Sequence, residues 1–164
     1  LFLLLACASV TEARLGETLQ KCIERYGPVI ETRKARLEQS DPQSSVFTKS
    51  GITIVIEFRN EVAWNIRYIA LDLIMDQVTE LLKANMPEGG GWSAAYDVAG
   101  IHYRVSSDRG ATAAFNPGRP GQPGVLELAT RDFNLAWHKV YSARIQDSIR
   151  LQPSRVDIKK LDGF

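Results

Sequence analysis

The stretch ITIVIEFRNEVAWNIRY, residues 52–68, decides the fold class of this sequence. Each of its halves alternates apolar residues with others, at Ile52, Ile54, Ile56 and Phe58 and then at Val62, Trp64, Ile66 and Tyr68. A period of two is typical of a half-buried β-strand. The polar residues 59–61 separate the halves, and Asn60 tolerates the left-handed backbone of a tight turn. The stretch therefore predicts a β-hairpin, with Asn65 and Arg67 on its wetter face.

Helices are predicted on both sides of this hairpin and near the C-terminal end. The first carries its apolar stripe at i, i+3, i+4 and i+7 and stops at Gly27–Pro28; its stripe is Leu19, Cys22, Ile23 and Tyr26. A second is expected over residues 74–85 and a third after a Thr130 cap. Between the second and third helices lie further strand patterns, IHYRV, ATAAF and VLELAT.

The order helix, strands, helix, strands, helix predicts an α+β fold, with an antiparallel sheet and helices packed on one face. A shift of 59 positions lays Cys22 on Leu81, which leaves open two helix-plus-sheet units in tandem. The expected organisation is one domain over residues 14–147, with repeat units 14–71 and 72–130, a closing helix over 132–147 and a mobile tail over 148–164.

The N-terminal run LFLLLACASV is apolar and uncharged. It is shorter than the roughly 20 apolar residues of a membrane-spanning helix, and it resembles the apolar region of a secretory signal peptide. The sequence therefore predicts export to the periplasm or the cell exterior, with removal of residues 1–13. Two alternatives stay open. One is lipidation at Cys7, which would give an outer-membrane lipoprotein, and the other is a buried N-terminal strand.

Several classes of chemistry lack their sequence signals. Lys and Arg number 20 against 19 Asp and Glu, without the basic stripe of a nucleic-acid binder. The HExxH, CxxC and GxSxG motifs are absent, so we expect no metal, no cofactor and no catalytic residue. The glycines at 89–91 follow a helix instead of opening one, which argues against a phosphate loop. Cys22 lies within an apolar stripe and is predicted to be buried and unreactive.

The remaining hypothesis is a non-catalytic module that binds an unknown protein or envelope component. Its first candidate site is the loop NPGRPGQPG, where Asn116, Arg119 and Gln122 could contact a partner from a backbone restricted by three prolines. The second candidate is the sheet face around Asn65 and Arg67. The alternative is a hydrolytic enzyme whose site is assembled from distant carboxylates and His102.

Three segments carry a resemblance to known proteins: RLGETLQKCIERYGPV, the hairpin at 52–68, and VTELLKAN followed by GGGW. Together they are similar to small, exported, uncharacterised bacterial proteins, over about residues 14–130. Their shared pattern is a Gly-Glu-Thr helix that ends in Arg-Tyr-Gly-x-Pro. The first helix also resembles small-protein-A-type lipoproteins and the β-lactamase-inhibitor-like fold, whose helix-and-sheet units act as interaction modules. This resemblance implies binding and assigns no functional residue.

Overall fold

The computed structural model describes residues 14–86 and 90–151, with only the backbone described over 145–151. Its elements follow in the order α1 (Leu19–Tyr26), β1 (Glu31–Lys34), β2 (Gln43–Lys49), β3 (Ile52–Arg59), β4 (Val62–Ala70), α2 (Met75–Ala84), β5 (Tyr96–Val98), β6 (Ile101–Val105), β7 (Ala111–Asn116), β8 (Gly124–Thr130) and α3 (Arg131–Leu151). The predicted signal segment 1–13, with Cys7, lies outside the described residues, as does the tail beyond residue 151.

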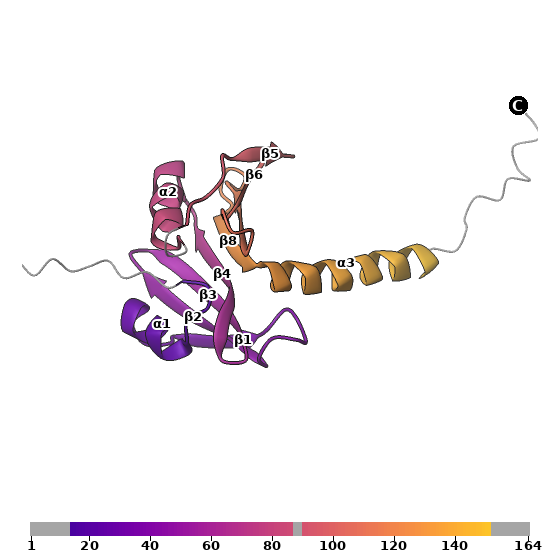
Figure 1. Ribbon diagram of the computed structural model, residues 1–164, viewed down its shortest axis with the longest axis horizontal. Coiled ribbons are helices and arrows are strands. Elements are labelled where there is room, and N and C mark those ends of the chain that lie inside the picture. The colour runs from indigo at the N-terminus through magenta and orange to yellow at the C-terminus, as the bar shows by residue number, and fades with distance from the viewer. Residues whose placement is uncertain (1–13, 87–89, 152–164) are drawn as a thin grey trace, which may run out of the picture.

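The strands form one antiparallel sheet in the order β1-β2-β3-β4-β8-β7-β6-β5. The predicted α+β class with an antiparallel sheet is confirmed. The order is symmetric about its centre, because each half consists of a helix followed by a four-stranded meander. The two halves meet where β4 pairs with β8, for example Ile66 with Leu128. Figure 1 shows β4 and β8 in the middle of the molecule, between the two groups of strands.

The 59-residue correspondence extends beyond the helices. It lays β2 on β6, β3 on β7 and β4 on β8, and it matches Tyr26 of α1 with Asn85 at the end of α2. Both of these side chains hydrogen-bond the hydroxyl group of Tyr68 on the central strand β4, each at 2.9 Å. Positions 59 residues apart thus meet at one buried residue.

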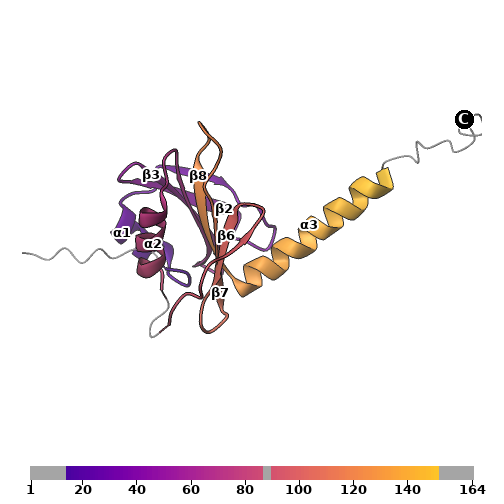
Figure 2. The same ribbon diagram turned by 90° about the horizontal axis from the view of Figure 1, so that it is seen from above.

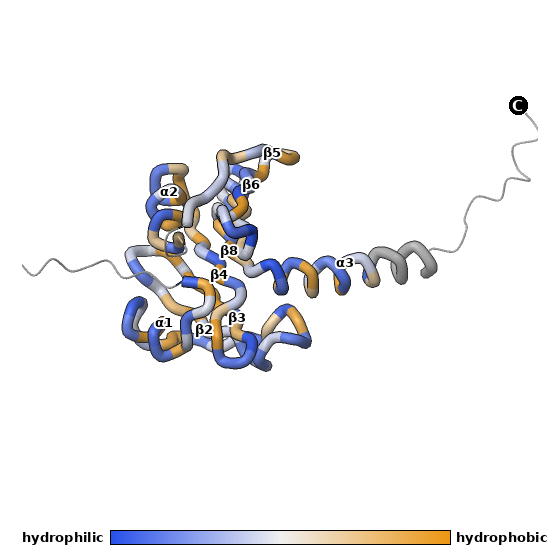
Figure 3. The backbone as a smooth tube through the Cα atoms, viewed as in Figure 1, coloured by the Kyte–Doolittle hydropathy of each residue, from blue (hydrophilic) through white to orange (hydrophobic). Residues whose placement is uncertain are grey.

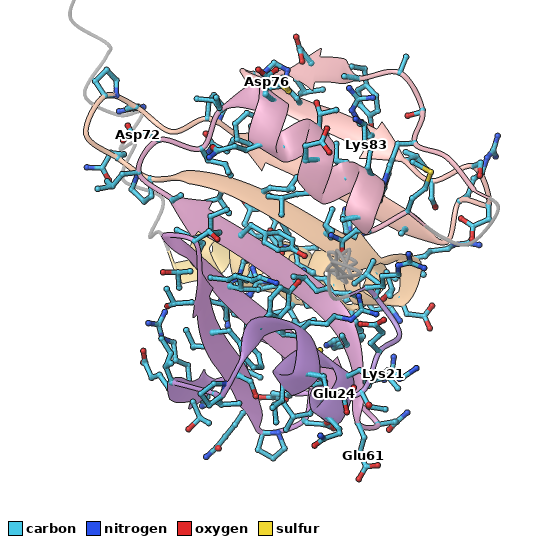
Figure 4. All side chains as sticks on the ribbon, turned by 90° about the vertical axis from the view of Figure 1, so that its left-hand side faces the viewer. Lys21, Glu24, Glu61, Asp72, Asp76 and Lys83 are labelled. Carbon is cyan, nitrogen blue, oxygen red and sulfur yellow. The ribbon has the colours of Figure 1, made fainter. Side chains whose placement is uncertain are left out.

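The main core lies between the sheet and the helices α1 and α2, on what we call the first face. Figure 4 views this face, with α2 (Asp76, Lys83) above α1 (Lys21, Glu24). The largest fully buried side chains of this core come from the sheet: Phe47, Ile56, Ile66, Tyr68, Leu126 and Leu128. Burial of these apolar side chains is the main source of stability for the fold.

Helix α3 begins on the opposite side of the sheet, which we call the second face. Phe133 packs edge-on against Trp64 at 5.2 Å, and Leu37 and Ala129 complete this smaller cluster. Beyond its first turns α3 leaves the body of the protein, as Figures 1 and 2 show from two directions. The helix runs to Leu151, past the predicted end at 147, and hydrophilic and hydrophobic segments alternate over its coloured part, residues 131–144 (Figure 3).

The predicted hairpin forms, with one local departure from strict alternation. Asn60 and Glu61 both adopt a positive φ, at 52° and 65°, as a two-residue type I′ turn requires. The register then shifts, because Glu57 pairs with Asn65 whereas Phe58 pairs with Ala63. Trp64 is the extra residue of this β-bulge and turns to the second face. The prediction that Trp64 shares a face with Ile66 was therefore wrong.

The prediction that Cys22 belongs to the core is confirmed, since its side chain is 0% exposed. Burial, followed by the negative charge of Glu17, raises the pKa of the Cys22 thiol from 9.0 to about 12. Because the thiolate is the reactive form, labelling by a thiol reagent should be slow in the folded protein and fast in denaturant. The thiol ionises near pH 9.0 in the unfolded chain but only near about pH 12 in the folded protein. The stability linked to this difference is therefore fully present below pH 9.0 and is lost as the pH rises towards about 12. We expect Cys22→Ala to lower the free energy of unfolding by about 1 kcal/mol. Rapid labelling of the folded protein would contradict a core role.

Candidate functional site

A hydrogen-bonded polar cluster lies on the second face and centres on Arg36, in the loop between β1 and β2. Its guanidinium donates to Glu57 Oε1 at 2.5 Å, to Asn65 Oδ1 at 2.7 Å and to Glu127 Oε1 at 2.7 Å. Its backbone N–H donates to the other oxygen of Glu57 at 3.0 Å. Burial alone would lower the pKa of Arg36, but the carboxylates of Glu127 and Glu57 outweigh burial and raise it. Arg36 therefore ties a loop to three strands.

Aromatic rings of α3 enclose this guanidinium. It lies 5.2 Å from the ring centre of Phe133 and 5.1 Å from that of Trp137, within the range of cation–π attraction. On the other side of Glu57, the Ser40 hydroxyl donates to the carboxylate at 3.2 Å and accepts from Trp64 Nε1 at 3.1 Å. The cluster therefore also fixes the start of α3 against the sheet.

Asn65 was expected on the wetter face of the hairpin, and this expectation was wrong, because Asn65 is buried together with its cross-strand partner Glu57. Both residues are 0% exposed. The reason is that the loop carrying Arg36 and the start of α3 cover this end of the sheet. The amide nitrogen of Asn65 donates to Glu127 and to the Leu128 carbonyl group, while its oxygen accepts from Arg36. Asn65 thus supports the cluster and has no free group for a partner.

Arg67 lies beside the cluster and, within residues 14–86 and 90–151, makes no side-chain hydrogen bond or ion pair, although the carboxylates of Glu127 and Glu57 attract its charge. Its cross-strand neighbour is Glu127, but Glu127 Oε1 already accepts from Arg36 and Asn65. The Nε atom of Arg67 is buried without a hydrogen bond, and no ion pair to this guanidinium occurs within residues 14–86 and 90–151. Burial, followed by the like charge of Arg36, lowers its pKa. A half-buried cation in this state would be stabilised by an added anion.

The other predicted contact residues lie apart from Arg67, in the turn between β7 and β8. Asn116 Oδ1 accepts from the backbone N–H of Gly118 at 2.9 Å, and the backbone N–H of Gln122 donates to the Arg119 carbonyl group at 2.8 Å. Gly118 has a φ of 76°, and a side chain there would collide with the carbonyl oxygen of Pro123. The loop is therefore tightly folded and exposed, and Arg119 and Gln122 point out of a defined turn.

His102, the histidine of the hydrolytic alternative, is half-buried on the first face. Its ring stacks on Phe115 at 5.8 Å, and its Nδ1 lies 2.5 Å from Asp97 Oδ1. In the described part of the chain, no serine, threonine or cysteine hydrogen-bonds this histidine. Nor does a cluster of three or more metal-ligating side chains occur among those residues.

Sequence reasoning identified Arg67 but missed Arg36, the centre of the cluster. Arg36 lies in RKARLEQSDPQSS, a polar segment that predicts only a loop. Its partners come from β3, β4 and β8, which no local pattern brings together. A weak signal was available, because Glu57 and Glu127 interrupt strands that are otherwise rich in apolar residues. A carboxylate in a buried strand predicts a cationic partner.

No helix in the described part of the chain is both long enough and apolar enough to span a bilayer. No protein-family model and no curated protein matches the sequence. Among solved structures, the chain is similar to a cysteine-rich secretory protein from Staphylococcus aureus subsp. aureus Mu50, with a TM-score of 0.42 and 9% sequence identity. The match covers 73% of this chain and 45% of the staphylococcal chain, so this chain spans less than half of that protein's length. A likeness this distant carries no inference about function.

Proposed function

We propose that this protein is an exported, non-catalytic binding module that recognises an acidic group of a protein or envelope component through the second face of its sheet. The observation that carries the proposal is the Arg67 guanidinium, which is half-buried beside Arg36 and has no hydrogen bond or ion pair among the described residues. The apolar segment at residues 1–10 supports export.

The surroundings of Arg67 are suited to recognition rather than to a reaction. Arg36, Glu57 and Asn65 hydrogen-bond to one another and hold the strands in place, whereas Arg67 makes no hydrogen bond or ion pair in the described part of the chain. A guanidinium binds a carboxylate through two parallel hydrogen bonds, which gives direction as well as affinity. The geometry at His102 offers no comparable support for the hydrolytic alternative.

Affinity capture from a native envelope extract tests the proposal with three variants. Arg67→Gln should lose the material that the parent retains, because the half-buried cation is gone. Lys83→Gln is the matched control, since Lys83 is an exposed cation of α2, on the first face, and is already paired with Glu80 at 2.6 Å. In the third variant Asn-Gly replaces residues 117–123, which should change the free energy of unfolding by no more than about 1 kcal/mol.

The outcomes separate the two candidate sites. If Arg67→Gln loses the captured material and the variant with the shortened loop retains it, the result would support a binding site on the second face. If Arg67→Gln retains the captured material and the variant with the shortened loop loses it, the proposal would be overturned. The binding site would then be the loop with Asn116, Arg119 and Gln122.

A further inference from the structure

One transverse row of side chains crosses the second face from the β5 edge to the centre of the sheet. The strand register links each member to the next, in the order Tyr96, Tyr103, Ala114, Glu127 and Arg67. Directly paired residues of antiparallel strands share a face of the sheet. Arg67 and the tyrosine pair are therefore the two ends of one continuous line of side chains.

The outer end of this row is an exposed aromatic platform. The rings of Tyr96 and Tyr103 stack with centres 5.6 Å apart and planes 21° apart. Tyr96 remains 53% exposed, so one face of the stacked pair is open to solvent. It also borders a surface hollow of about 760 Å³ that is lined by Val105 and Arg109, among others. The platform offers a ring face and the hollow offers room beside it.

The distance between the two ends defines the length of a ligand. Arg67 and Tyr103 are separated by three strand-to-strand steps, or about 14 Å at the usual spacing between strands. An extended peptide covers this distance in about four residues. Charge complementarity sets the direction of the ligand. Arg67, which has no ion pair among the described residues, favours an acidic residue at the end of the ligand that lies over it.

The middle of the row distinguishes a peptide from an acidic sugar. Ala114 lies between the platform and Glu127 and offers no side-chain hydrogen bond, while Glu127 Oε1 already accepts from Arg36 and Asn65. The hydroxyl group of Thr112, the next residue of β7 on this face, already accepts from Asn134 Nδ2 at 2.8 Å. Sugar recognition needs hydrogen-bonding groups for hydroxyls along its length, whereas a small peptide side chain needs only space over Ala114.

We propose that the second face binds an extended peptide, with an acidic side chain at Arg67 and an aromatic ring, four residues away, on Tyr96 and Tyr103. This inference rests on the proposed function, because it uses the same arginine. It adds a second contact, at Tyr96 and Tyr103, and a spacing of four residues between the two contacts. An experiment can disprove either addition without disproving binding at Arg67.

The test is fluorescence anisotropy of the full chain with three labelled peptides: Glu-Ser-Ser-Ser-Phe, Glu-Ser-Phe and Gln-Ser-Ser-Ser-Phe. The first should bind at least about tenfold more tightly than the other two, by the loss expected for one charged hydrogen bond or one aromatic contact. Tyr103→Ala and Arg67→Gln should each weaken its binding by a similar factor, whereas Tyr103→Phe should retain it. Tyr141→Ala, at an exposed tyrosine of α3, is the control that should change nothing.

Each contrary result has a distinct meaning. Binding that depends on glutamate and Arg67, but not on Tyr103 or on the spacing, would overturn this inference and leave the proposed function intact. Peptide binding that is unchanged in Arg67→Gln would overturn both this inference and the proposed function. Tighter binding of an oligogalacturonate than of the first peptide would overturn the choice of a peptide.

Discussion

Replacing Glu57 by alanine is expected to lower the free energy of unfolding by about 3–5 kcal/mol, the usual cost of breaking a buried ion pair from one side. The Glu57 side chain is 1% exposed, and its two oxygens accept from Arg36, through Nε and the backbone N–H, and from Ser40. Its removal leaves the Nε and backbone N–H of Arg36 and the hydroxyl group of Ser40 without the carboxylate that accepts their hydrogen bonds. Urea denaturation of both proteins measures the difference.

The matched control for this prediction is Glu31→Ala. Glu31 also pairs with an arginine, Arg33, but the two side chains are 50% and 48% exposed. Water replaces an exposed pair at little cost, so the denaturation midpoint should stay where it is. If Glu57→Ala changed the midpoint as little as Glu31→Ala, the Arg36 cluster would not be a structural support of the second face.

The second large effect is expected at Leu126, which is 0% exposed on β8. It pairs with Tyr68 in the first half of the sheet and with Phe115 in the second. Leu126→Ala should lower the free energy of unfolding by about 3–5 kcal/mol, because the cavity left behind has rigid walls on both sides. Leu135→Ala, at an exposed leucine of α3, should cost no more than about 0.5 kcal/mol.

The same variant tests whether the two halves unfold together. Since Leu126 contacts both, the destabilised protein should still show one transition, coincident by circular dichroism and by tryptophan fluorescence. Two separate transitions would mean that each helix-plus-meander unit is stable without the other. The central β4–β8 pair would then be an interface between domains.

The fold was predictable where its signals are local. Alternation over residues 52–68 and the polar Asn60 gave the hairpin, and the stripe around Cys22 with its Gly27 stop gave α1. The symmetric strand order was not predictable, since the β4–β8 pairing joins residues far apart in the chain. The position of α3 on the second face follows from that pairing and was missed with it.

The candidate site was predictable only in part, for a related reason. Alternation correctly placed Arg67 opposite Ile66, on the face away from the main core. It could not show that Asn65 is covered, because the cover comes from Arg36 and from α3. The bulge at Trp64 is likewise invisible in a period-two pattern, because the extra residue looks like any other apolar position.

The symmetric strand order has a consequence for how the chain folds and for how it can associate. Hairpins within each half are closed by short turns, such as Ser50–Gly51 and Ala99–Gly100, so these halves can form quickly from local contacts. The β4–β8 contact must instead close a long loop and should form late. Until it forms, each half presents an unpaired central strand. At high concentration, two chains can pair these central strands by exchanging halves, so that β4 of one chain pairs with β8 of the other. Such a domain-swapped dimer would contain every strand pairing of the monomer.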